Sequence, residues 1–354
     1  MIAAFELGDL GRFGLFSGLK ILGVFSVLMF IVAYAVWVER KVSAAIQDRR
    51  GPNRVGPFGL LQPVADGIKS FLKEDFTPGH VRKAYYWLAP AIVMIPSLLT
   101  VAIIPFGSYL GNQKMVIADL NVGILYTFGI VSLGVYGIVL AGYAANSKYP
   151  FLGGIRSSAQ MVSYEIAMGM SVVPIFLIVG SLNLGQVVEY QTGSIFHWLI
   201  FKQPIAFIIF VAAMFAETNR LPFDLPESEQ ELAGGYNVEY SSMKFALFFM
   251  GEYAAMTAAS AMMVTLFFGG WSLPFAGLDQ PAASGDLTRG LLHIAIFLGK
   301  TLCVEFLIIW VRWMWPRFRY DQLMDLGWRR FIPLALANIV ITATILWMQV
   351  KHAA

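Results

Sequence analysis

The chain has 354 residues, of which 58% are hydrophobic and only 13% are charged, and its mean hydropathy is +0.67. A soluble globular protein carries about 25% charged residues, so the surplus of apolar residues must face lipid. The net charge of +3 is too small for a nucleic-acid-binding surface, and the single cysteine, Cys303, excludes an internal disulfide and a thiolate set for an iron–sulfur cluster.

Eight segments are apolar over the length of about 20 residues that a helix needs to cross a bilayer core of about 30 Å. Because backbone groups in lipid must bond within their own segment, we expect all eight to be helices. The fifth is interrupted near its start by Lys202 and Pro204. The sequence therefore predicts an all-α integral membrane protein with one polytopic domain, whose spans are roughly 19–38, 85–106, 122–144, 160–180, 198–216, 242–268, 291–311 and 331–350.

Lysine and arginine are distributed unevenly between the two sides of these spans. Seventeen of them fall in the alternate connections 39–84, 145–159, 217–241 and 312–330, whereas the opposite side, with both tails, holds six. Since basic residues are enriched in cytoplasmic loops, we expect the first set to be cytoplasmic. With an even number of spans, both termini would then be periplasmic in a bacterial cell inner membrane. The first 19 residues lack the basic start of a signal peptide, so we expect them to be mature sequence.

The first of these connections is too long and too patterned to be a plain loop. Residues 51–59 (GPNRVGPFG) should be irregular, and Pro63 is then well placed to begin a helix. The apolar residues of that helix fall on one face: Val64, Ile68, Phe71 and Leu72. This pattern predicts an amphipathic helix that can lie in the plane of the membrane.

Four charged residues lie inside predicted spans: Glu165, Glu252, Lys300 and Glu305. A charge at the bilayer centre costs about 2.5–3.5 kcal/mol on insertion scales, so each needs a partner or a wet cavity. Glu305 and Arg312 are nearly two turns apart and would share a helix face. Buried carboxylates can exchange protons through water, which favours a proton path, and structural ion pairs between helices are the alternative.

The connection after the fifth span, 215–240 (FAETNRLPFDLPESEQELAGGYNVEY), is strongly acidic. Against one arginine, Arg220, it carries Glu217, Asp224, Glu227, Glu229, Glu231 and Glu239. Taken alone, it is compatible with a solvated loop whose acids favour the start of a helix. Acidic clusters are unusual on the cytoplasmic side, however, and aromatic residues such as Phe223 are interleaved. The mixture favours a polar cavity or a docking surface for another protein.

Two basic stretches follow the first and the seventh spans, at 39–54 and 312–330. Anchoring at the cytoplasmic interface explains part of each stretch. The chain has no glycine-rich dinucleotide motif after a strand, no P-loop and no pair of histidines at metal-ligand spacing. We therefore expect it to bind no metal, nucleotide or other cofactor.

Four longer stretches together resemble the H subunit (subunit 1 in mitochondria) of proton-pumping NADH:quinone oxidoreductase, respiratory complex I. They are 39–75 (ERKVSAAIQDRRGPNRVGPFGLLQPVADGIKSFLKED), 153–165 (GGIRSSAQMVSYE), 215–253 (from FAETNRLPFDLPESEQELAGGYNVEY to FMGEY) and 315–328 (WPRFRYDQLMDLGW). The likeness runs from about residue 20 to 350 in the same order, and motifs of this length are highly specific. One departure is Ser228, where the family pattern has glycine.

The resemblance implies a subunit that joins the membrane arm of the complex to its peripheral arm. It would line the entry tunnel for quinone, whose headgroup is reduced in partner subunits that also hold NADH, flavin and the iron–sulfur clusters. The implied tunnel residues, in which arginines hold oxygens and the aromatic ring packs on the isoprenoid tail, are Arg40, Arg49, Asp66, Arg220, Phe223 and Arg312. The implied proton-coupling chain is Glu39, Glu165, Glu217, Asp224, Glu227, Glu231 and Glu252, with Glu229, Lys300 and Glu305 as further candidates.

Other interpretations stay open from the residues alone. The homologous membrane subunit of a proton-pumping hydrogenase complex is similar but handles no quinone. A stand-alone secondary transporter would show paired inverted halves around a midplane site, whereas the charges here gather near one face. A purely structural anchor for peripheral subunits would leave the buried glutamates without a function.

Overall fold

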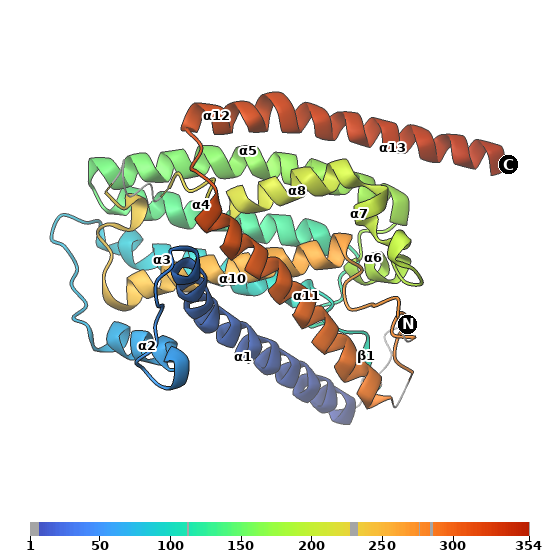
Figure 1. Cartoon of the computed structure of the whole chain (residues 1–354), viewed down its shortest axis with the longest axis horizontal. Coiled ribbons are helices and arrows are strands. Elements are labelled where there is room, and N and C mark those ends of the chain that lie inside the picture. The colour runs from blue at the N-terminus through green and yellow to red at the C-terminus, as the bar shows by residue number, and fades with distance from the viewer. Residues whose placement is uncertain (1–6, 112, 227–232, 276, 284–285, 354) are drawn as a thin grey trace.

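The computed structural model describes residues 7–111, 113–226, 233–275, 277–283 and 286–353, and its regular structure is almost entirely helical (Figure 1). Among these residues seven helical segments are long and apolar enough to cross a membrane. An eighth apolar helix, α8 (Pro204–Glu217), is shorter. The long segments are α1 (Leu7–Ile46), α3 (Lys83–Thr100) with the 3-10 turn Val101–Ile103, α4 (Gly123–Ala144), α5 (Lys148–Val179), α10 (Ser242–Phe267), α11 (Leu287–Met314), and α12 (Tyr320–Asp325) continued through the π-helical turn Leu326–Phe331 into α13 (Ile332–Ala353). The all-α membrane architecture is thus confirmed.

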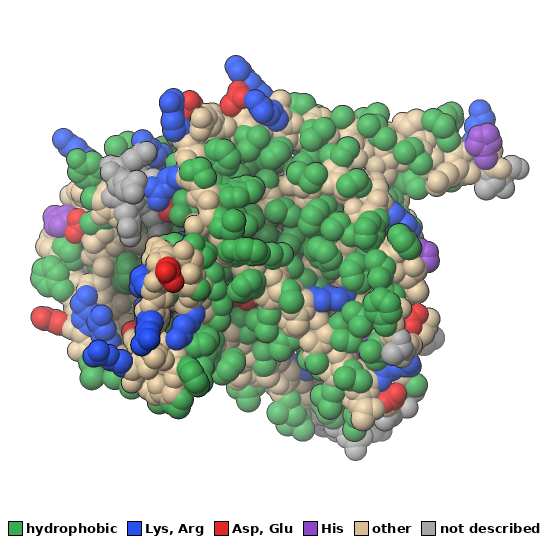
Figure 2. Space-filling view, viewed as in Figure 1, with side chains coloured by type: hydrophobic (Ala, Val, Ile, Leu, Met, Phe, Trp, Pro, Cys, Tyr) green, Lys and Arg blue, Asp and Glu red, His purple; other side chains and the backbone are tan. Residues whose placement is uncertain are grey.

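Helix α10 is the centre of the bundle and the most deeply buried of the long helices. It packs against α3 on one side and against α1 and α11 on the other. Beyond α3 follow α4, α5 and α8, and α13 lies on the outer surface of α5 (Figure 1). Hydrophobic side chains cover the middle of the face in Figure 2, as a lipid-facing surface requires.

The two ends of the bundle differ in character. One end, here called the α2 end, carries the amphipathic helix α2 (Gln62–Leu72), the connection 218–241 and α12 (Figure 1). The other, the hairpin end, carries β1 (Tyr109–Leu110) and β2 (Gln113–Lys114), which pair antiparallel. It also carries α6 (Leu184–Tyr190), α7 (Leu199–Lys202), the first turn of α1 and the last turn of α13.

The short elements have clear local causes. Pro63 lies in the first turn of α2, where its missing N–H costs nothing. The side chain of Asn183 accepts from the backbone N–H groups of Gly185 and Gln186 and so begins α6. Gly180, at φ +75°, ends α5 in the left-handed conformation that glycine adopts readily.

Several helix ends differ from the predicted spans. Helix α5 begins twelve residues before the predicted 160, because tertiary packing holds its polar start: Gly142 of α4 approaches Pro150 so closely that a Cβ would lie 2.5 Å from the Pro150 carbonyl oxygen. The predicted fifth span, 198–216, is split between α7 and α8, since Pro204 begins a new helix. Helix α1 extends beyond 19–38 in both directions, and the last segment is helical from Tyr320, well before 331.

Candidate functional site

Four side chains from four parts of the chain form a buried ion cluster near the α2 end. Glu39 of α1 accepts from Arg312 of α11, from Arg220 at 3.2 Å and from the Tyr253 hydroxyl of α10 at 2.6 Å. Glu39 and Arg220 are almost completely shielded from solvent. The sequence separation of these residues shows that the cluster exists only because α1, α10 and α11 pack together.

Arg220 extends this cluster to a second carboxylate. Its Nε lies 2.8 Å from Glu252 Oε1, and its guanidinium stacks 4.2 Å from the centre of the Tyr253 ring. The turn after α8 fixes its backbone, since its N–H donates to Phe215 and its carbonyl accepts from Phe223. At 2% exposure, this guanidinium depends on two carboxylates to offset the cost of its burial. Those carboxylates and the nearby Tyr253 hold the pKa of Arg220 well above its ordinary value, so it stays charged.

A groove of about 710 Å³ leads from the membrane-facing surface to this cluster. Its walls are α1, α2, α10 and the end of α11. Arg40 and Asp66 form an ion pair of 2.7 Å across its mouth, and Asp66 also accepts from Gln62. Its other lining residues include the charged Glu39 and Arg312, the phenolic Tyr253, and the apolar Met29, Val32, Val36, Phe71, Phe249 and Met250. The groove therefore combines an apolar channel with a charged inner end.

Helix α2 forms one side of the groove and presents an uncovered apolar face. Phe71 is 73% exposed and Leu72 is 81% exposed, and Val64 and Ile68 are more than half exposed. The end of α2 is tied to α10, because the Ser242 hydroxyl lies 3.0 Å from the Ser70 carbonyl and 2.9 Å from that of Lys73. The predicted amphipathic helix is thus confirmed, with its apolar face toward the surroundings of the bundle.

Arg49 lies outside this groove. It lines a neighbouring hollow of about 680 Å³ together with Arg40, Arg50 and Arg54, and its side chain binds Gln47 at 2.6 Å. Arg40 is shared by the hollow and the groove. The arginines therefore form a positively charged rim beside the mouth of the groove.

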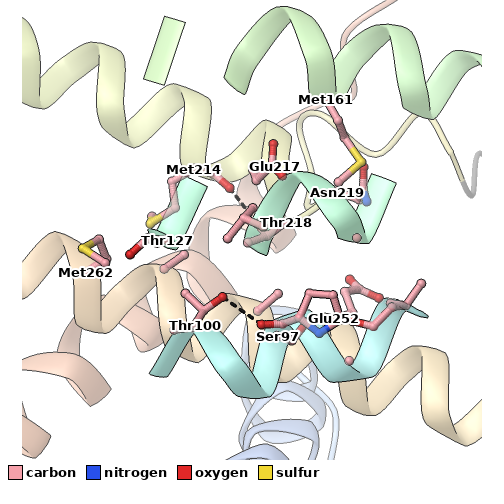
Figure 3. Close-up of a pocket in the computed structure, with 18 of the residues that line it drawn as sticks. Ser97, Thr100, Thr127, Met161, Met214, Glu217, Thr218, Asn219, Glu252 and Met262 are labelled. Atoms are coloured by element: carbon pink, nitrogen blue, oxygen red, sulfur yellow. Dashed lines mark hydrogen bonds between the residues drawn. The ribbon is translucent and has the colours of Figure 1, made fainter. Parts of the chain in front are cut away.

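On the other side of Arg220 lies an enclosed cavity of about 100 Å³ (Figure 3). Glu217 and Thr218 border it on one side, and Ser97, Thr100 and Glu252 border it on the other. A water molecule needs roughly 10–15 Å³ of such space and two or more polar partners, so the cavity has room for several. Both carboxylate oxygens of Glu217 are buried, and neither has a hydrogen-bond partner among the described residues. Water in the cavity would satisfy them.

Glu165 continues the carboxylate series beyond the cavity. It is half-buried in α5, is hydrogen-bonded to Ser132 of α4, and lies close enough to Glu217 for the two charges to repel. The carboxylates Glu39, Glu252, Glu217 and Glu165 thus follow one another from α1 to α5. Among the described residues this series joins the groove to the far side of the bundle.

The remaining predicted acids of the connection after α8 are placed only in part. Asp224 is buried, and Arg317 lies 2.8 Å from its Oδ2. Burial raises the pKa of Asp224, and Arg317 offsets that rise only partly. Glu227, Glu229 and Glu231 lie outside the described residues.

Phe223 is buried and does not line the groove. Its ring packs against Tyr164 at 5.3 Å and Phe318 at 5.4 Å between ring centres, and its carbonyl accepts from Gln160 at 2.7 Å. Its contact with the site is through the backbone, since its N–H donates to the Arg220 carbonyl at 2.8 Å. It positions the turn that carries Arg220.

Glu305 and Lys300, both in α11, have separate surroundings. Glu305 is buried and accepts from Thr257, one turn along α10 from Tyr253, at 3.2 Å. The predicted shared face with Arg312 gives no ion pair, because Arg312 turns to Glu39. Lys300 donates to the carbonyls of Phe268, Gly270 and Ser272 at the hairpin end of α10, so it is remote from the groove and acts as a cap for that helix end.

Sequence reasoning missed Tyr253, Arg317 and Thr257 as members of the site. Tyr253 follows Glu252 directly and ends one of the long motifs, which was a usable signal. Nothing in the pattern distinguished Arg317 from the other basic residues of 312–330, and Thr257 has the appearance of an ordinary helix threonine.

Comparison with known proteins places this arrangement among relatives of similar length. Residues 19–343 match the family model described as NADH dehydrogenase. The first of two H subunits of NADH-quinone oxidoreductase from Cytophaga hutchinsonii is 49% identical over 326 residues, which cover 90% of this chain and 93% of that protein. The second such H subunit from Koribacter versatilis is 47% identical over 355 residues, covering 95% and 98%. The H subunit from Paramagnetospirillum magneticum is 49% identical over 328 residues, covering 93% and 91%.

Proposed function

The chain belongs to the NADH dehydrogenase family as a homologue of the H subunit of NADH-quinone oxidoreductase, and from this premise we propose that it forms the quinone entry path and the start of the carboxylate chain that couples quinone reduction to proton translocation. In this function the chain is a multi-pass membrane subunit and binds no cofactor of its own. The α2 end is cytoplasmic and faces the peripheral subunits, and both termini are periplasmic. The excess of basic residues in the connections at the α2 end supports this orientation.

The observation that carries the proposal is that one guanidinium, that of Arg220, separates a membrane-facing groove from an internal acidic cavity. A quinone has an apolar tail and a polar headgroup. The apolar walls of α1 and α10 suit the tail, and the exposed face of α2 provides a way in from the bilayer. The headgroup oxygens would meet Arg40, Asp66 and Arg312 at the charged parts of the groove.

Arg49 and Phe223 have indirect roles in this proposal. Arg49 belongs to the positive rim, which attracts acidic groups of a partner subunit or the negative charge of a reduced headgroup. Phe223 holds the turn of Arg220 and acts on the tunnel through that residue.

The coupling follows from competition for arginine. When negative charge develops near Arg312, that guanidinium interacts less with Glu39, and Glu39 then depends more on Arg220. Glu252, which shares Arg220, is left with a weaker counter-charge. That change favours proton binding by Glu252 from water in the cavity, and repulsion passes the effect on to Glu217 and Glu165.

Other acids extend this chain. Asp224 joins it from the loop, since its buried carboxyl lies beside Arg317, and we propose the same for Glu227 and Glu231, with Glu229 as a further candidate. Glu305 is a side branch reached through Thr257. Lys300 would not carry protons, because its ammonium is occupied by three carbonyls, and would instead hold the hairpin end of α10 in place.

Two measurements on the assembled complex test the two halves of the proposal. Arg40→Ala should raise the apparent KM for quinone without lowering assembly, and Arg329→Ala, an exposed arginine of the π-helical turn, is the control. An unchanged KM would count against the tunnel role of Arg40.

For the coupling, Glu217→Gln, Glu165→Gln and Glu252→Gln should each lower the number of protons pumped per NADH oxidised in proteoliposomes. Glu189→Gln, on α6 at the hairpin end, should leave it unchanged. Normal pumping and turnover in all three variants would remove these carboxylates from the pathway.

A further inference from the structure

A second groove, of about 510 Å³, lies at the hairpin end between α1, α11 and the β1–β2 hairpin. These elements meet at the lower right of Figure 1. Helix α1 separates it from the first groove, since Leu28 and Ile31 line the second and Met29 and Val32 line the first. The two grooves therefore open at the levels of opposite leaflets.

The lining of the second groove is almost wholly apolar. Gly23, Val24 and Val27 of α1 face Ile294 and Phe297 of α11 across it. Two threonines line its inner end, and both use their hydroxyl groups within the protein. Thr301 donates to the Phe297 carbonyl at 2.9 Å, and Thr257 is bonded to the Tyr253 carbonyl and to Glu305. A hydrocarbon chain suits this lining, and a polar substrate does not.

The mouth of the groove carries one cation among its described lining residues, Lys20, whose Nζ lies 3.5 Å from Gln113 Oε1. Lys20 is nineteen residues before Glu39 in the same helix, which corresponds to about 28 Å at 1.5 Å per residue. That is close to the thickness of the bilayer core. Because Glu39 marks the α2 end, the Lys20 ammonium lies at the headgroup level of the opposite leaflet.

The volume of the groove argues against a transmembrane helix as its occupant. A helix about 10 Å across and about 30 Å long occupies roughly 2,400 Å³, several times the space available. One hydrocarbon chain fits better, and the lysine at the mouth is complementary to a phosphate. We propose that this groove binds a phospholipid of the leaflet at the hairpin end, with an acyl chain between α1 and α11 and its phosphate at Lys20.

This site is independent of the proposed quinone path and has its own consequence. Its inner end reaches Thr257, the residue that binds Glu305. An acyl chain in the groove keeps water away from that buried carboxylate on the side opposite the quinone groove. The lipid thus completes the apolar seam between α1 and α11.

Glycines of α1 provide a matched pair of variants. A Cβ at Gly23, which lines the groove, and one at Gly18, which does not, would each meet no atom within 4 Å. Gly23→Leu therefore fills the groove without a clash at its Cβ, and Gly18→Leu adds the same side chain elsewhere on the same helix. Lys20→Gln removes the charge at the mouth and leaves the apolar groove.

The experiment uses the whole complex in nanodiscs that contain a phospholipid with a photoreactive acyl chain, followed by mapping of labelled peptides. Labelling of α1 at 23–31 and α11 at 294–301 is expected in the unaltered complex and in Gly18→Leu, and it should be lost in Gly23→Leu. Lys20→Gln should weaken it, and if Gly23→Leu does not assemble, the Lys20→Gln result decides.

Two outcomes would overturn the proposal. One is equal labelling in Gly23→Leu and Gly18→Leu, and the other is labelling of these segments by a photoreactive long-chain quinone in preference to the phospholipid. Cross-links from the same positions to a neighbouring subunit, with no lipid label, would assign the groove to a protein partner and also contradict it.

Discussion

Glu39 and Glu252 bind the same guanidinium group, that of Arg220, although they come from α1 and α10 and face different spaces. Glu39 lines the groove that opens toward the bilayer, and Glu252 lines the enclosed cavity. A change in the charge near one carboxylate therefore reaches the other through a single side chain. No movement of a helix is needed for this first step of coupling.

Arg220→Lys tests whether the shape of the guanidinium matters or only its charge. An ammonium keeps the positive charge but cannot hold two carboxylates on separate nitrogens, so one of them loses its partner. Breaking a buried ion pair costs about 3–5 kcal/mol, and we expect a fall of that size in the free energy of unfolding, with loss of quinone reductase activity in the complex. Thermal unfolding and NADH:quinone activity measure the two effects, and full activity in Arg220→Lys would refute the bridging role.

Tyr253→Phe removes the hydroxyl that donates to Glu39 at 2.6 Å and keeps the ring under Arg220. A hydrogen bond to a charged group contributes about 1.5–3 kcal/mol, so turnover should fall by about ten-fold or more while assembly is preserved. Tyr190→Phe, which loses a contact with Lys202 at the hairpin end, is the matched control. Equal activity of the two variants would show that the Glu39 contact has no part in turnover.

Phe71→Ala tests the entry route along α2. Loss of this exposed ring should weaken the contact with the tail of a long-chain quinone by about 1 kcal/mol, which raises its apparent KM by about five-fold. A short-chain quinone should show no change, because its tail does not reach the helix. Phe201→Ala, another exposed ring but at the hairpin end, serves as control, and a similar rise in KM for both quinones would contradict entry past Phe71.

Gly153→Ala tests how tightly α5 holds the acidic connection. A Cβ at Gly153 would lie 3.0 Å from the Pro226 carbonyl oxygen and 3.1 Å from the Tyr236 nitrogen, so the connection must shift. Overpacking of this kind costs about 1–3 kcal/mol, and we expect a lower melting temperature together with reduced coupling. Gly169→Ala in the same helix meets nothing within 4 Å and should be neutral or slightly stabilising. If both variants melt at the same temperature, the close contact at Gly153 is unimportant.

The sequence was sufficient for the membrane class, for the number of apolar segments and for α2, because the apolar length and the spacing of Val64, Ile68 and Phe71 are local properties. It was insufficient for the helix ends. The start of α5 is polar and contains two adjacent glycines, Gly153 and Gly154, a pattern typical of a loop. Only contact with α4 and with the acidic connection explains why it is helical.

The partners of the charged residues depended even more on the fold. Composition showed that Glu252 and Glu305 needed partners, but not which ones, since Arg220 and Thr257 reach them through tertiary packing. Lys300 shows the opposite case. Its burial suggested a role with the acids, whereas three backbone carbonyls satisfy it at the far end of the bundle.

The lengths of α1 and α5 have a consequence for assembly. At 1.5 Å per residue, their 40 and 32 residues extend about 60 Å and 48 Å, well beyond the roughly 30 Å of hydrocarbon. The surplus makes a stiff pedestal that raises the basic and acidic connections clear of the headgroups. A protein that lands there meets a surface already in its final shape, so little conformational entropy is lost on association, and the angle between the two arms is set by rods instead of by flexible tethers.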